Sequence, residues 1–128
     1  ISMRLNIRFF FQRRIRGFDD SDLWNLDHTI LKFAAPRLRR LAETTHGFPY
    51  DLLRSDHESL SEDEQKERSD AAYRQWQLMI RQMARACELW VEHGGIFLDK
   101  NNKEDPKLKK EFDEGWTLFK EYFFALWN

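Results

Sequence analysis

The sequence SEDEQKERSDAAYRQWQLMIRQMARACELWVEHGG, residues 61–95, decides the fold of this chain. Ser61 followed by Glu64 is the capping-box pattern of a helix start, and Gly94-Gly95 supplies the backbone freedom that ends a helix. Between these signals, apolar residues recur every three or four positions, which is the spacing of a face that packs against another helix. Its members are Tyr73, Trp76, Ile80, Met83, Cys87 and Trp90. The stretch predicts one long amphipathic helix.

A second helix is predicted downstream, where Asp105 is placed to cap and Pro106 occupies the first turn. Its apolar residues form one broad stripe. They are Leu108, Phe112, Gly115, Trp116, Phe119, Tyr122, Phe123, Leu126 and Trp127. We expect this helix to be largely buried, and its aromatic content predicts an interface in a homo-oligomer.

A third helix is predicted upstream, beginning near Ser21 after the capping oxygens of Asp19 and Asp20. Its apolar residues follow helical spacing and include Leu23, Leu26, Ile30, Phe33 and Ala34. Pro36 removes a backbone hydrogen bond, so we expect a kink there, or two helices meeting near Ala35. Gly47 and Pro49 close the region, and residues 47–60 are predicted to form a loop.

The N-terminal segment, residues 1–17, is basic and contains no acid. Residues 3–11 approach a two-residue alternation of apolar and polar side chains, which predicts a short extended segment. The arginines are Arg4, Arg8, Arg13, Arg14 and Arg16. Two interpretations are open: a basic arm for a polyanion, or an arm folded onto the acidic surface of the chain itself.

Length and composition fit one domain: 128 residues, of which 41% are hydrophobic and 34% charged. The predicted class is mainly α, with three long helices in a small bundle, the first kinked at Pro36. Residues 1–17 would be a basic segment of this single domain, 1–128, and residues 18–128 the helical bundle. Because Met3 follows Ile1-Ser2, we expect Met3 to be the natural start.

The cellular compartment of the protein is predicted from its cysteine content and from the lack of membrane-spanning and signal sequences. Cys87 is a single cysteine and cannot form an internal disulfide, which favours a reducing compartment. A membrane-spanning stretch and a signal peptide are both missing, so we expect a cytoplasmic protein that does not engage a membrane.

Catalytic motifs are also missing: there is no phosphate-binding glycine loop, nucleophile elbow or histidine pair at metal-binding spacing. We therefore expect a non-enzymatic protein without cofactor or metal. Asp27 lies in an apolar turn, and we expect a tryptophan N–H or an arginine to pair with it; a raised pKa would instead indicate a functional acid. Cys87 is expected to be a buried hydrophobe.

The candidate binding residues combine arginines with an aromatic ring. Guanidinium groups bind phosphate and rings stack on bases, so the set suits a nucleotide-like small molecule or a nucleic-acid strand. The set is Arg4, Arg8, Arg13, Arg14, Arg16, Arg37, Arg40 and Trp24. The alternative interpretation is a solvated charged face beside phenylalanines that fill the core.

The order of these features resembles a family of small, uncharacterised tailed-bacteriophage proteins. The resemblance covers most of residues 15–128. It rests on Gly17-Phe18, Asp22, Trp24-Asn25-Leu26-Asp27, Pro36-Arg37-Leu38, His46-Gly47-Phe48-Pro49, Trp76, Met83, Gly115-Trp116, Leu118-Phe119, Tyr122-Phe123 and Leu126-Trp127. These motifs are of structural type and carry no catalytic residue over.

The resemblance implies expression in the cytoplasm of an infected bacterial host. We therefore predict a phage accessory protein that antagonises the host or its defence system by binding a host protein or by sequestering a nucleotide-like signal. The alternative is a nucleic-acid-binding protein that uses the N-terminal arginines.

Overall fold

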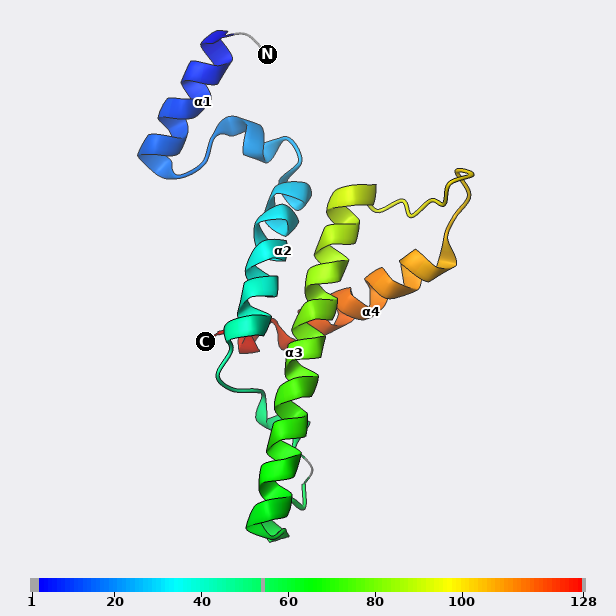
Figure 1. Cartoon of the computed structure of the whole chain (residues 1–128). Coiled ribbons are helices and arrows are strands. Elements are labelled where there is room, and N and C mark those ends of the chain that lie inside the picture. Colours follow the sequence, from blue (N-terminus) through cyan, green and yellow to red (C-terminus); the bar gives the residue numbers. More distant parts are fainter. Residues whose placement is uncertain (1–2, 54, 128) are drawn as a thin grey trace.

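The computed structural model describes residues 3–53 and 55–127, and it is mainly helical (Figure 1). The start expected at Met3 concerns residues 1–2, which lie outside the described part. The described residues form four α-helices: α1 Met3–Arg16, α2 Leu26–Thr44, α3 Glu62–His93 and α4 Pro106–Tyr122. Short 3₁₀ helices are η1 Asp20–Leu23, η2 Tyr50–Leu52, η3 His57–Ser59 and η4 Phe123–Ala125. The mainly α prediction is confirmed, with four α-helices in place of three and no strand within the described ranges.

Helix α3 is the central element and begins and ends as its sequence predicts. The Ser61 hydroxyl accepts a hydrogen bond from the Glu64 N–H at 3.3 Å, and Gly94 ends the helix with φ 66°. Its packed face is buried from Ala72 to Leu89, and the largest fully buried side chains on it are Trp76, Ile80, Met83 and Leu89. This face is the apolar base on which both α2 and α4 pack.

Helix α2 packs along α3 through Leu31, Ala35, Leu38 and Ala42, which are all buried. Pro36 lies inside this helix on its exposed side, so the alternative of two helices meeting near Ala35 is wrong. The apolar contacts on the opposite side hold the helix together across the missing backbone hydrogen bond. The helix also begins later than predicted, because η1 occupies the stretch around Ser21. The predicted loop 47–60 holds η2 and η3.

Helix α4 crosses α3 (Figure 1), and Gly115 lies against Gln82 and Ala86 of α3 at this crossing. Asp105 caps its start by accepting from the Lys107 N–H at 3.0 Å. A Cβ at Gly115 would overlap the Gln82 carbonyl oxygen and lie 2.8 Å from Ala86 Cβ, so the crossing requires glycine. The prediction that α4 is largely buried is wrong: only Phe112 and Gly115 are buried on it, because α4 packs mainly on α3 and has open surface on its other side.

The prediction of an extended segment over residues 3–11 is also wrong, since these residues belong to α1. The alternation fails at Phe9, Phe10 and Phe11, and a lone strand would leave its backbone groups unpaired, whereas a helix satisfies them internally. Helix α1 projects away from α3 and α4, and it contacts η1 (Figure 1). Its one buried residue is Phe9, whose ring meets the Trp24 ring edge-on at 5.6 Å.

Candidate functional site

Side-chain hydrogen bonds to Asp20 attach the inner side of α1 to η1. Arg8 and Gln12 each donate to Asp20 Oδ2 at 2.8 Å, and Arg16 donates to Asp20 Oδ1 at 2.5 Å. Positions 8, 12 and 16 are four apart and therefore share one side of the helix. Hydrogen bonds from Gln12 and then Arg16 lower the pKa of Asp20. This carboxylate is thus a bound counter-ion of the N-terminal segment.

Asp19 forms a second attachment and has no exposed surface. Its Oδ1 accepts from the Ser21 hydroxyl and from the Ser21 N–H, the latter at 2.8 Å, and its Oδ2 lies 2.5 Å from Arg13 Nε. Hydrogen bonding from the Ser21 hydroxyl is the main cause that lowers the pKa of Asp19. The interpretation of an arm folded onto the acidic residues of the chain itself is therefore confirmed for Arg8, Arg13 and Arg16.

Two of the other predicted binding residues, Arg37 and Arg40, lie on α2, away from this attachment. Arg37 on α2 places its guanidinium 3.6 Å from the centre of the Phe33 ring and donates to the Phe33 carbonyl at 3.0 Å. Arg40 pairs with Glu43 at 3.1 Å, and Trp24 lies beside Phe9. Arg8, Arg13 and Arg16 thus pair with Asp19 and Asp20, whereas Arg37 and Arg40 contact partners within α2.

The outward side of α1 is the most distinctive surface of the N-terminal region. Its large apolar side chains are exposed: Met3 78%, Ile7 50%, Phe10 58%, Phe11 57% and Ile15 84%. Arg4 and Arg14 lie among them, and within the described part of the chain no ion pair reaches either one. We name these seven residues the outer face of α1. It combines exposed apolar area with two cations that the fold leaves available.

The strand period predicted for residues 3–11 does not reveal this face. With the period of a helix, positions 3, 7, 11 and 15 fall along one side, and positions 5, 9, 12 and 16 fall on the opposite side. The second set contains Phe9 and Arg16, which face η1. The signal for the outer face was present in the spacing of the sequence.

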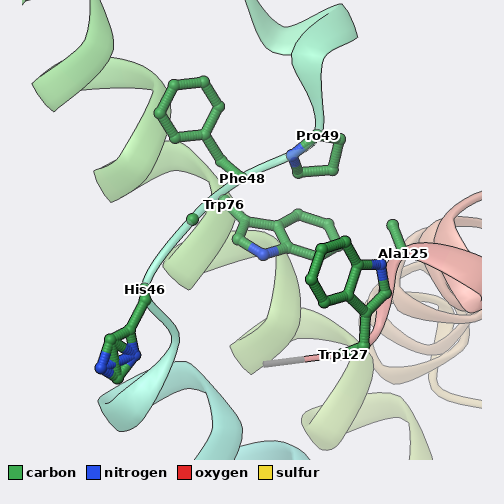
Figure 2. A pocket seen from close by; sticks show the side chains of 7 residues that line it. His46, Phe48, Pro49, Trp76, Ala125 and Trp127 are labelled. Atoms are coloured by element: carbon green, nitrogen blue, oxygen red, sulfur yellow. The ribbon is translucent and has the colours of Figure 1, made fainter.

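A separate hollow of about 320 Å³ lies where the segment after α2 meets the C-terminal end of the described chain (Figure 2). Its walls are mainly apolar and aromatic, formed by Phe48, Pro49, Trp76, Ala125 and Trp127, with His46 and Gly47 at the edge. Trp76 is only 2% exposed and forms part of the core. The hollow suits a small apolar group and includes none of the predicted binding residues.

Asp27 and Cys87 are both engaged in structural roles. Trp90 Nε1 donates to Asp27 Oδ2 at 2.8 Å, which confirms the predicted indole partner, although Asp27 is exposed. This bond is the main cause that lowers the pKa of Asp27, so the alternative of a raised pKa is wrong. Cys87 is buried as predicted, and burial raises the pKa of its thiol to about 11. A thiol with that pKa is a poor nucleophile at neutral pH.

Over residues 3–53 and 55–127, no three His, Cys, Asp or Glu side chains are grouped so that they could hold a metal ion. None of the helices in these ranges is long and apolar enough to cross a bilayer. In comparisons with protein-family models, curated protein sequences and solved structures, nothing matches the chain.

Proposed function

We propose that this chain is a non-enzymatic binding protein that acts by occupying the surface of another protein, with the outer face of α1 as the contact. The observation that carries the proposal is the exposure of five large apolar side chains along one side of a projecting helix. Exposed apolar patches of this kind are typical of protein interaction sites. The contacts of the inner side with Asp19 and Asp20 turn the outer face away from η1 and would orient it before a partner binds.

The charges on this face support a protein partner over a nucleotide or a nucleic-acid strand. Phosphate binding draws on several free guanidinium groups. Arg8, Arg13 and Arg16 already pair with Asp19 and Asp20. Arg4 and Arg14 remain as two cations at the border of an apolar surface, where they would guide an acidic partner surface into register.

The resemblance to tailed-bacteriophage proteins makes a bacterial host protein the partner to seek first. Occupation of a host surface needs no catalytic group. An antagonist of a host or defence system would need only affinity and a fixed geometry, and the exposed apolar side chains of α1 support this role.

The test starts with a photo-crosslinking amino acid in place of Phe10 and, as control, in place of Leu78 on α3. Leu78 is 57% exposed, the same fraction as Phe11, but lies on another helix. Both proteins are irradiated in a bacterial lysate, and adducts specific to position 10 are identified. The identified protein is then purified, and its dissociation constant is measured with the unmodified chain, Phe11→Asp and Leu78→Asp.

We expect Phe11→Asp to weaken binding at least about tenfold, which corresponds to about 1.4 kcal/mol, because it places a charge in the centre of the contact. Leu78→Asp should bind as the unmodified chain does. Equal binding of Phe11→Asp by the purified partner would overturn the proposal. Co-purification of a nucleotide or nucleic acid that is lost on Arg4→Gln and Arg14→Gln substitution would also overturn it and favour the phosphate-binding alternatives.

A further inference from the structure

Helix α2 carries a second exposed apolar surface, on the side turned away from α3. Leu26, Ile30 and Phe33 are 49%, 52% and 60% exposed, while Leu31 and Leu38 of the same helix are buried against α3. The spacing of four and three places the first three in one row along the helix. With Phe18 and Leu23 they line a hollow of about 590 Å³. We name Leu26, Ile30 and Phe33 the α2 row.

The two ends of the α2 row differ in charge. Arg37 follows Phe33 by four positions, so it continues the row, and its guanidinium lies over the Phe33 ring. Asp22 also lines the hollow, and its carbonyl accepts a hydrogen bond from the Thr29 hydroxyl at 3.2 Å, which places Asp22 beside the half of the row that contains Leu26 and Ile30. Its carboxylate accepts a hydrogen bond from the Asp19 N–H at 3.1 Å. The row is therefore apolar in its middle, cationic at one end and anionic near the other.

This pattern is complementary to itself. In a dimer with a two-fold axis through the middle of the row, the rows of the two copies would run antiparallel. The apolar side chains of one copy would then pack against those of the other. The same operation would bring the cationic end of each row toward the anionic end of the other, and opposite charges favour that orientation over the parallel one. A lipid surface or a uniformly charged partner would satisfy only one of the two ends.

We propose that the chain forms a homodimer in which the α2 rows of two copies pack antiparallel, with Arg37 of each copy facing Asp22 of the partner subunit. Ile30 lies near the two-fold axis in this arrangement. The part of α2 from Leu26 to Arg37 spans roughly 17 Å, which is short for a helix pair, so the dimer should dissociate on dilution. The outer face of α1 has no part in this contact, and the inference does not depend on the proposed function.

The test is sedimentation velocity over a wide concentration series. We expect the unmodified chain to rise from the monomer mass of 15.6 kDa to twice that mass. Ile30→Asp should stay monomeric, because it puts two carboxylates against each other at the axis. Leu78→Asp and Phe11→Asp, which change exposed residues elsewhere, should dimerise as the unmodified chain does. Circular dichroism checks that all variants remain helical.

A charge exchange tests the orientation. Arg37→Asp should weaken the dimer by placing like charges together, and Asp22→Arg in the same chain should restore it. The inference is overturned if the unmodified chain stays monomeric at every concentration, if Ile30→Asp dimerises normally, or if Phe11→Asp abolishes the dimer. The antiparallel orientation would be overturned if Arg37→Asp left the dissociation constant of the dimer unchanged. It would also be overturned if the dimer stayed weakened in the chain that carries both Arg37→Asp and Asp22→Arg.

Discussion

Helices α3 and α1 both carry arginines and large apolar side chains, yet the fold uses them in opposite ways. In α3, the apolar face is buried between α2 and α4, and Ile80 and Met83 have no exposed surface. In α1, Phe9 alone is buried, and attachment depends on charged contacts to Asp19 and Asp20. The apolar content of a helix therefore predicts a contact surface. It does not predict whether that surface is contacted by the chain itself or by another molecule.

The largest effect should come from removing apolar volume at the centre of α3. Ile80→Ala should lower the free energy of unfolding by about 2–5 kcal/mol, because a fully buried side chain leaves a cavity. Leu78→Ala is the control on the same helix, since that side chain is 57% exposed. Urea unfolding followed by circular dichroism measures both. If both variants lost the same free energy of unfolding, the buried and exposed sides of α3 would contribute equally to stability, which would contradict this prediction.

The crossing of α3 and α4 should give the next largest effect. Gly115→Ala should cost about 1–3 kcal/mol, because the new methyl group meets the Gln82 carbonyl oxygen and Ala86. The gain in helix propensity, at most about 1 kcal/mol, offsets only part of this. Gly47→Ala is the matched control, since a Cβ there has open space around it. A stable Gly115→Ala protein would mean that the two helices can separate without loss.

The core elements could be predicted from sequence because their signals are local. The capping pattern at Ser61, the glycine end at Gly94 and the Asp105-Pro106 start each act within one turn of the helix. The burial of α4 could not be predicted in the same way. The apolar stripe around Phe112 predicts that another element packs on it, but it does not predict how much of the stripe that element covers. Only the crossing at Gly115 decides that.

The N-terminal region was harder to predict because two periods compete there. Residues 3–11 fit the period of a strand in part, and the fit ends where Phe9, Phe10 and Phe11 follow one another. The arginines were recognised as a group, but their partners Asp19 and Asp20 act through space after a turn at Gly17, whose φ is 81°. Spacing alone could not divide paired from unpaired guanidinium groups.

Substitutions at two phenylalanines of α1 should differ in their effect on the attachment of this helix. Phe9→Ala should release α1 from η1, since Phe9 is 7% exposed and meets the Trp24 ring, whereas Phe11→Ala should leave α1 attached. The loss for Phe9→Ala should be limited to the free energy of attaching α1, because the buried core of α2, α3 and α4 contains no residue of α1. Amide hydrogen exchange along α1 measures the difference. Equal exchange in the two variants would contradict it.

Acid should separate α1 from the core as well. The folded-state pKa values of Asp19 and Asp20 are lowered, so their pairing stabilises the attachment above the ordinary aspartate pKa of about 3.9 and is lost as the pH falls through the folded values. The amide signals of α1 in a pH titration should therefore change before those of α3. In Asp20→Asn this change should be smaller, because one of the two titrating groups is gone. Simultaneous loss of both helices would contradict the comparison.

The smallest effect should separate two arginines of α1 that lie two positions apart. Arg16 donates to Asp20, and both side chains are partly exposed, so Arg16→Gln should weaken the attachment of α1 only slightly and raise hydrogen exchange in α1 by a small factor. Arg14 lies on the outer face, where no ion pair is described, and Arg14→Gln should leave hydrogen exchange in α1 unchanged. Raising the salt concentration should reduce the difference between the two variants, because exposed ion pairs are screened. If Arg14→Gln proved the more damaging change, the assignment of inner and outer sides would be reversed, and with it the surface proposed to meet a partner.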